Sequence, residues 1–409
     1  MWLEVLGVSL KKHVVDLDQV LHEETPVMGF HRRRPPTFRS LLQAMTRRCR
    51  RALHRGVDLT QADRYVKRYK SVELALALVC YFVLGIGSVR QLKERLDHDP
   101  RLRSHVRLNG ISHSQLPKLL KARSSELWAP LIVELLSQLS GQRAPSALRL
   151  MDTSFFAMGV KLFSRIHGRE YKPEAAGMEL GMVIDPANSS PLRWDCRIGA
   201  GHDTLHVHAL VPPDDDIAGL TYIFDRGFLK YDFWADLIER KAHFITRATC
   251  QLRHRMIAFK PLDPNHPEII ADEMVFMGAR PDRTRLKMPL RRIVLVAENE
   301  TIVFLSSRFD LSALEVTQLY RQRWQIEIFF RWIKRVIGCL KPLAYSQNAA
   351  EHTLYAAIVA YLLTLMIADI DTSDNTNRPV ARIRRAITQI RARLYQKPTR
   401  QMLRNIGFI

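Results

Sequence analysis

Four residues near position 320 combine a carboxylate with three groups that can bind phosphate. At about 100° per residue, Tyr320, Arg323, Glu327 and Lys334 fall within an arc of about 60° if the segment forms one α-helix. Apolar residues occupy the neighbouring arc and would dock this helix rigidly on a core: Leu319, Ile326, Phe329, Phe330 and Ile333. The segment therefore predicts an acid held among phosphate-binding groups.

A simpler interpretation is an exposed helix in which Arg323 and Glu327 form an i,i+4 ion pair. Such a pair contributes only roughly 0.2–0.5 kcal/mol, and the order Arg before Glu is the less favourable one. This segment alone does not decide between the two interpretations, so the remaining acids and the overall charge must be considered with it.

Two aspartates follow segments that read as strands. Asp152 follows Leu148 and Leu150 at a period of two, and Asp225 comes directly after the apolar run 222–224. We expect both acids at the ends of strands, where open α/β sheets place their chemistry. A single Asp after a strand is also a common turn residue or helix cap, so each of them is weak evidence alone.

Other acids near the predicted sheet compete with these two: Asp185, Asp203, Asp232, Asp236 and the run Asp214–Asp216. The run follows two prolines in a polar segment, so we interpret it as a solvated loop. Clustered carboxylates repel one another unless divalent cations bind between them. Oxygen ligands favour Mg²⁺ or Mn²⁺ over zinc, and two such ions about 3.5–4 Å apart can support an in-line phosphoryl transfer.

The charge of the chain points to a polyanionic partner. Its 409 residues hold 62 Lys and Arg against 41 Asp and Glu, a net charge of +21. Nucleic acid is the first candidate, because a basic surface of this extent needs a large anion. The basic residues gather in five clusters: 31–34, 47–51, 253–255, 280–292 and 378–404.

Cysteine usage and hydropathy bear on the compartment. The five cysteines are far apart and form no Cys-x-x-Cys pair, so neither a disulfide framework nor a zinc ribbon is indicated and a cytoplasmic location is expected. The longest uncharged apolar run, 354–368, predicts a buried core helix that is too short to span a bilayer. The first residues lack the pattern of a secretory signal, and we expect no membrane partner.

The first third of the chain, residues 1–140, predicts an all-α N-terminal domain. Glycine turns at 85–88 and 109–110 separate helical segments, and a helix over 115–123 would present Lys118, Lys121 and Arg123. This pattern predicts a helix-turn-helix reader of DNA. An ordinary bundle of short helices joined by glycine turns would give the same pattern.

After a break at 140–145 the pattern changes to strands. Apolar runs with turn residues between them predict strands at 147–151, 178–184, 193–198, 221–224 and 243–246. Further strands at 268–276, 291–296 and 301–306 form a β insertion over about 247–308, and helices resume at Leu311. The predicted fold class is α/β: a mixed-sheet domain over 146–370, followed by a basic helical C-terminal region over 371–409.

The spacing Tyr-(2)-Arg-(3)-Glu-(6)-Lys at Tyr320, Arg323, Glu327 and Lys334 resembles the signature of the IS4 family of bacterial insertion-sequence transposases. Two further segments are similar to the aspartate motifs of that family: Asp152-Thr153-Ser154 and Asp225-Arg226-Gly227-Phe228, where the family usually has Tyr at the last position. The resemblance covers roughly residues 146 to 370.

The resemblance implies a ribonuclease-H-like catalytic domain with a β insertion, in which Asp152, Asp225 and Glu327 bind two Mg²⁺ or Mn²⁺ ions. It also implies that Tyr320, Arg323 and Lys334 hold DNA phosphates at the terminal inverted repeats. The expected activity is cut-and-paste transposition by a homodimer that joins the excised ends to target DNA.

Three questions stay open at this point. Members of the family pass through a DNA hairpin in which a Trp of the insertion stacks on a flipped base, whereas residues 247–308 contain no Trp. Stacking would have to use Phe259, Phe276, Phe304 or a residue from elsewhere. The chain could also be a catalytically silent DNA-binding protein derived from a transposase, or a metal-dependent nuclease that cuts without joining.

Overall fold

A computed structural model describes residues 40–405, apart from gaps. The gaps are 57, 60–62, 67, 141–145, 158–163, 165–169, 171, 173–175, 188–189, 279–285, 298–299, 338–342, 344–345 and 369–386. The basic cluster at 31–34, most of the predicted break at 140–145 and the start of the predicted C-terminal region therefore lie outside the described residues.

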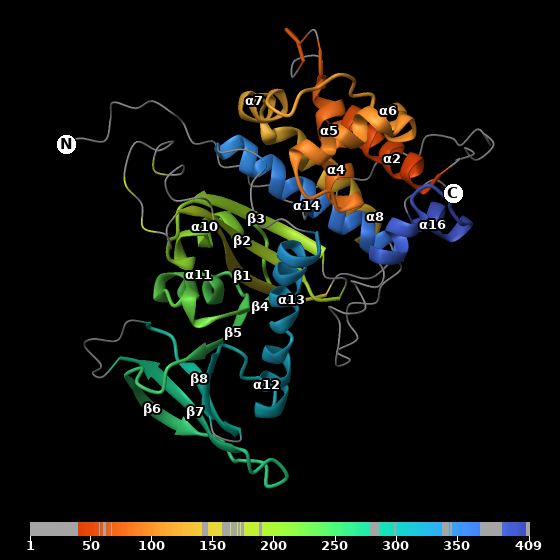
Figure 1. Cartoon of the computed structure of the whole chain (residues 1–409). Coiled ribbons are helices and arrows are strands. Elements are labelled where there is room, and N and C mark those ends of the chain that lie inside the picture. Colours follow the sequence, from red (N-terminus) through yellow and green to blue (C-terminus); the bar gives the residue numbers. More distant parts are fainter. Residues whose placement is uncertain are drawn as a thin grey trace.

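A nine-stranded mixed sheet runs from the middle of the molecule to one end (Figure 1), with the order β3-β2-β1-β4-β5-β9-β8-β7-β6. The strands are β1 (Leu148–Ala157), β2 (Gly177–Asp185), β3 (Ser190–Ile198), β4 (Thr221–Phe224), β5 (His243–Ala248), β6 (His254–Phe259), β7 (Ile269–Met277), β8 (Leu290–Ala297) and β9 (Glu300–Ser306). Strands β1, β4 and β5 run parallel, and their neighbours are antiparallel. This arrangement confirms the predicted mixed α/β fold.

Helices cover both faces of the central strands β1, β4 and β5, because these strands are apolar on both sides. On one face, Leu150, Ile223 and Ile245 join the core that includes α13 (Trp324–Trp332) and α14 (Gln347–Ala368). On the other face, Met151 and Phe224 join a second core, which includes α10 (Val207–Leu210) and α11 (Tyr231–Glu239). This central part of the sheet therefore lies between two layers of helices (Figure 1).

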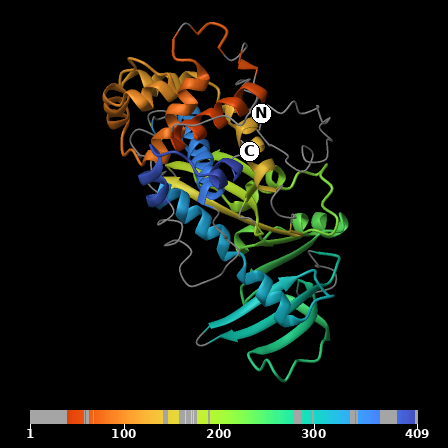
Figure 2. The same ribbon diagram turned by 90° about the vertical axis from the view of Figure 1, so that its right-hand side faces the viewer.

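The β insertion is confirmed, with one strand more than predicted. Strands β6 to β8 extend the sheet as an arm below its centre, and α12 (Ala313–Arg321) leads back from it (Figures 1 and 2). The sequence does not predict strand β6. Both of its faces are exposed, so it lacks the alternation of apolar and polar residues that marks a half-buried strand. Arg291 of β8 and Asp272 of β7 form a buried ion pair with contacts of 2.8 and 2.6 Å that joins two strands of this arm.

The N-terminal helices pack around α14 rather than around one another alone. They are α2 (Leu41–Gly56), α4 (Ser71–Leu84), α5 (Val89–His98), α6 (Pro100–Val106), α7 (Gln115–Ala122) and α8 (Trp128–Ser140). Trp128 donates from Nε1 to Nδ1 of His352 on α14, at 2.8 Å. The predicted helix over 115–123 is confirmed as α7, and Gly85 ends α4 with a positive φ of 67°.

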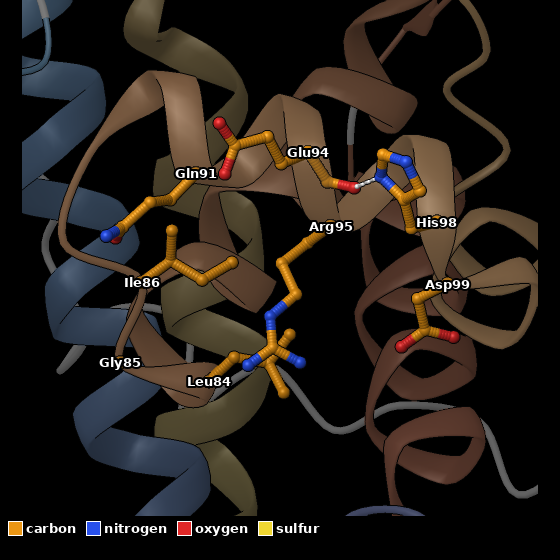
Figure 3. A pocket seen from close by; sticks show the side chains of 8 residues that line it. All are labelled: Leu84, Gly85, Ile86, Gln91, Glu94, Arg95, His98 and Asp99. Carbon is orange, nitrogen blue, oxygen red and sulfur yellow. Dashed lines mark hydrogen bonds between the residues drawn. The ribbon is translucent and has the colours of Figure 1, made fainter.

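The C-terminal region returns to the same helical layer. The guanidinium of Arg391 donates to the carbonyl oxygens of Phe82 and Val83, and Tyr395 donates to Asp99. A cavity of about 490 Å³ lies between the end of α4 and helix α5, lined among others by Arg95, His98 and Asp99 (Figure 3). The helical layer thus combines segments from both ends of the chain.

Helix α14 is longer than the apolar run predicted. It extends over Gln347–Ala368, and by length and composition it is the one straight helix among the described residues that could cross a membrane. Its apolar window is buried throughout by the surrounding helices and the edge of the sheet. The prediction of a buried core helix is confirmed.

Candidate active site

The sheet brings Asp152 and Asp225 to adjacent positions. Strands β1 and β4 pair in parallel, with Leu150 beside Ile223 and Met151 beside Phe224, and the two aspartates are the next residues of each strand. Because side chains alternate along a strand, both carboxylates are expected on the face of Leu150 and Ile223, which α13 covers. The pairing of two strands about 70 residues apart in the sequence thus assembles two acids.

Asp152 does not lie at the end of its strand, so that prediction was wrong. Strand β1 continues to Ala157, because residues 152–157 pair with β2. Strand β4 does end at Phe224, and Asp225 caps the short helical turn Arg226–Phe228 by accepting from the Arg226 amide at 2.7 Å. The flank of Asp152 is open because its neighbour strand stops, not because its own strand does.

The signature segment is two helices rather than one continuous helix, which corrects the helical-wheel prediction. Helix α12 ends at Arg321, and α13 begins at Trp324. In between, the Arg323 amide donates to the Tyr320 carbonyl at 3.0 Å, and the Ile326 amide donates to the Arg323 carbonyl at 3.1 Å. These i→i−3 bonds tighten the helical path and change the direction of the side chains.

Arg323 joins two of the three predicted acids. Its Nη2 lies 2.6 Å from Oε1 of Glu327, and its Nη1 lies 3.4 Å from Oδ2 of Asp152. Its side chain is only 13% exposed, so this is not the solvated pair of the simpler interpretation. Burial lowers the pKa of Arg323, but the neighbouring Tyr320, Glu327 and Asp152 outweigh burial and raise it.

Burial raises the pKa of Asp152 to about 7. Arg323 and a hydrogen bond of 2.8 Å from the Thr153 amide act in the opposite direction, whereas the nearby carboxylates of Asp225 and Asp203 raise it further. The acids are therefore close enough to repel one another.

Tyr320 and Lys334 border this group. Tyr320 is 7% exposed and packs against Phe304, with ring centroids 5.2 Å apart. Its hydroxyl has no hydrogen-bond partner among the described residues, and burial raises its pKa to about 12. Lys334, in the π-helical turn Ile333–Ile337, donates to the Phe155 carbonyl at 2.6 Å.

From the sequence alone, Asp203 is one of several acids that can be neither assigned to the site nor excluded from it. It begins the short helical turn η3 (Asp203–Leu205), accepts from the Thr153 hydroxyl, and lies against Gly227. Two of the other competitors have different partners: Asp185 accepts from the amides of Ser146 and Ala187, and Asp236 pairs with Arg240. The predicted solvated run is only partly so, because Asp215 pairs with Arg193.

The donors suit a hard divalent cation, since Asp152, Asp225 and Glu327 offer only carboxylate oxygens. Within the described part of the chain, however, no three acidic, His or Cys side chains are placed to hold one ion together. The guanidinium of Arg323 lies between Asp152 and Glu327 and supplies the positive charge there. The residue types fit Mg²⁺ or Mn²⁺, provided that Arg323 gives up at least one of its two acids.

Two aromatic side chains are exposed, one directly after Arg323 and one in the insertion. Trp324, directly after Arg323, is 51% exposed with the Arg331 guanidinium over its ring, and Phe259 on β6 is 78% exposed. Phe304 is buried in the core, so it is not free to stack on a base. Trp324 lies outside the insertion at 247–308, which contains no Trp.

Comparison with known proteins supports one family. The model of the transposase DDE domain matches residues 150–363, which is more than half of the chain. A putative transposase, y4zB, of Sinorhizobium fredii is 30% identical over 227 residues, or 54% of this chain and 61% of the relative. A probable transposase of insertion sequence element IS5377 from Geobacillus stearothermophilus is 25% identical over 240 residues, 58% of this chain and 60% of the relative. The chain thus spans about three fifths of each relative.

Proposed function

The chain belongs to the transposase DDE domain family, and from this premise we propose that it binds the terminal inverted repeats of an insertion sequence and moves that element by cutting and joining DNA strands. Two observations carry the proposal: the pairing of β1 with β4 places Asp152 and Asp225 at neighbouring positions, and Arg323 bridges Asp152 and Glu327. Both relatives are named as transposases, which agrees with it.

In this proposal Asp152, Asp225 and Glu327 hold two Mg²⁺ or Mn²⁺ ions. Bound ions would activate an attacking water or 3′-hydroxyl and stabilise the leaving oxygen. The protein's part is to hold the acids rigidly: Thr153 and Arg226 fix two of them by backbone hydrogen bonds, and α13 presents the third. The burial that raises the pKa of Asp152 also excludes water from its carboxylate.

We propose that Arg323, Tyr320 and Lys334 contact the phosphate next to the cleaved bond. A guanidinium binds phosphate and carboxylate with the same planar geometry, so Arg323 can exchange its acids for a DNA phosphate when cations enter. The unpartnered hydroxyl of Tyr320 lies beside Arg323 and could donate to the same phosphate. Arg323 would thus neutralise the acids before DNA binds and the phosphate afterwards.

A second contact with DNA is proposed in the helical layer. A cavity of about 280 Å³ between α2 and the end of α6 is lined by Gln43, Thr46, Arg47, Arg50, Ser104, His105 and Arg107, and none of these is an acid. Burial lowers the pKa of Arg50, and the charge of Arg107 lowers it further, with Glu73 offsetting part of the effect. An anion would relieve this repulsion, so we assign the cavity to a backbone phosphate of the bound end.

Point substitutions test this contact better than a deletion. Removing residues 1–140 would strip α14 of the helices that bury it, so the shortened chain would not report on DNA binding alone. Arg50→Ala should lower affinity for all DNA sequences alike and reduce the salt dependence by about one charge. Arg101→Ala, which removes an exposed arginine of α6 outside the cavity, is the matched control. An unchanged salt dependence for Arg50→Ala would refute the contact.

The proposed division of labour places end recognition in residues 1–140, cleavage in 146–370 and further DNA contact in 371–409. Pairing of two ends requires two active sites, so a homodimer is proposed for the complex with DNA. Cross-linking of the protein on a duplex that carries both ends would test it, and a monomer that cuts a single end efficiently would speak against it.

The decisive experiment is cleavage of a labelled duplex that carries one end of the element in which the chain is encoded. Wild type and Glu327→Gln are compared with Mg²⁺, with Mn²⁺ and with EDTA. Metal-dependent nicking at the boundary, lost in Glu327→Gln while binding persists, supports the proposal. Cuts without joining to a target would indicate a nuclease, and binding without cuts would indicate a silent DNA-binding descendant.

A further inference from the structure

We propose that Asp203 is a positioning residue that fixes the relative placement of Asp152 and Asp225. The inference rests on the proposed function of those two acids, and it concerns contacts that neither the sequence signature nor the family match assigns. Asp203 lies between the segments that carry the two acids and contacts a residue of each: Thr153 and Gly227.

The first contact reaches the segment of Asp152. The hydroxyl of Thr153 donates to Oδ1 of Asp203, while the backbone amide of the same Thr153 donates to Oδ1 of Asp152 at 2.8 Å. Successive side chains of a strand point to opposite faces, so Thr153 and Asp152 face opposite sides of the sheet. Asp203 therefore holds, from the far side of the sheet, the residue whose amide orients the Asp152 carboxylate.

The second contact reaches the segment of Asp225. A Cβ atom added to Gly227 would lie 1.7 Å from Oδ2 of Asp203, so only glycine allows this carboxylate to approach so closely. Gly227 follows Arg226, whose amide orients Asp225 at 2.7 Å. With one oxygen directed to each segment, Asp203 acts as a spacer between them rather than as a ligand of its own.

A buried ion cluster holds Asp203 itself in place. The amide of His206 donates to the Asp203 carbonyl at 3.1 Å. The fully buried ring of His206 contacts Asp195 at 2.9 Å and Glu179 at 3.1 Å, which ties the turn of Asp203 to β3 and β2. Gly181 leaves room for this ring, because a Cβ there would lie 2.8 Å from it. Strands β2 and β3 thus hold the turn of Asp203 in place, and this turn contacts the segments of Asp152 and Asp225.

The experiment compares Thr153→Val, Thr153→Ser, Asp203→Asn and Gly227→Ala with wild type. Two quantities are measured: Mn²⁺ binding to the full chain without DNA, and the Mn²⁺ dependence of cleavage. Residues behind metal ligands typically contribute about 10–100-fold in metal affinity or activity. We expect Thr153→Val and Gly227→Ala to raise the Mn²⁺ concentration for half-maximal cleavage by about tenfold. Their DNA affinity should be unchanged. Thr153→Ser keeps the hydroxyl and should show the wild-type Mn²⁺ dependence.

Asp214→Asn is the matched control, since Asp214 is an exposed acid of the same connecting segment. Thr153→Val keeps the shape of the side chain, so a thermal unfolding midpoint near that of wild type separates positioning from loss of fold. Wild-type Mn²⁺ dependence in both Thr153→Val and Asp203→Asn would overturn the inference. A wild-type chain that neither binds Mn²⁺ nor cleaves would instead refute the proposed function and the inference with it.

Discussion

The acids around Asp152 and the arginine-lined cavity between α2 and α6 each gather like charges. They differ in whether the chain itself places an opposite charge among them. Around Asp152 the chain gathers carboxylates and supplies its own counter-charge, because Arg323 bridges Asp152 and Glu327. Between α2 and α6 it gathers Arg47, Arg50 and Arg107 in a cavity that no acid lines. The first group is compensated before any ligand arrives, whereas the second is completed best by an anion from outside.

This difference suggests an order of events. A site in which Arg323 already bridges two acids must exchange Arg323 before it can act, whereas a cavity lined by arginines and by no acid attracts DNA from a distance, by an electrostatic force that salt screens. The cavity would therefore engage DNA first, and the acid group would react only once a phosphate draws Arg323 away. The predictions below remove one element of this comparison at a time.

The largest effect is expected where the acids have no substitute. Asp225→Asn removes a carboxylate next to Asp152 and should lower the cleavage rate by about 10²–10³-fold, which is the typical cost of losing a single charge-stabilising group. Single-turnover cleavage of labelled DNA measures it. Asp232→Asn, an exposed acid on α11, should cleave as wild type does. Near-normal cleavage by Asp225→Asn would end the assignment of Asp225 to the site.

The next effect is a large loss of stability caused by a change in the insertion, which leaves the acids around Asp152 in place. Arg291 and Asp272 are 2% and 5% exposed and form a closed pair that needs no ligand. Asp272→Ala leaves a buried guanidinium uncompensated and should lower the free energy of unfolding by about 3–5 kcal/mol. Urea unfolding measures the loss. If Asp272→Ala unfolds at the wild-type urea concentration, then leaving the Arg291 guanidinium buried without Asp272 does not lower the free energy of unfolding as predicted.

Arg323→Ala tests the exchange directly. In the metal-free protein it leaves Asp152 and Glu327 without their counter-charge, so we expect a loss of about 1–3 kcal/mol in stability. Added Mn²⁺ should restore more stability to this variant than to wild type, and cleavage should still be impaired because the phosphate contact is gone. Thermal unfolding with and without Mn²⁺ checks the first point. Normal cleavage by Arg323→Ala would exclude the proposed phosphate role.

The smallest effect concerns the pH dependence of the cluster behind the site. Burial lowers the pKa of His206, but the hydrogen bonds to Asp195 and Glu179 outweigh it and raise the pKa, with Arg197 and Asp203 as further charged neighbours. The stabilisation is therefore complete below the ordinary histidine pKa of about 6.5 and declines as pH rises through the raised value. Urea unfolding of wild type and His206→Gln between pH 6 and 9 should show a shrinking difference. A difference that grows with pH would contradict the charged form.

Local pattern carried much of the fold. Apolar runs bounded by turn residues predicted β2, β3 and most strands of the insertion, and the glycine turn at 85–88 predicted the boundary between α4 and α5. It failed where a neighbour outside the pattern decided the outcome. Strand β1 continues past Asp152 because β2 pairs with it, and α12 and α13 separate at Gln322 and Arg323.

By itself, the sequence determined the family signature, the α/β class and the residue types of the acid group, because these depend on composition and short spacings. Only the tertiary structure decided that Asp152 and Asp225 are neighbours, that Arg323 bridges two acids, and that Asp203 joins the site. It likewise decided that α14 is the common core of helices from both ends of the chain. These contacts join residues tens to hundreds of positions apart, and such pairings follow from strand order and packing, which local periodicity does not encode.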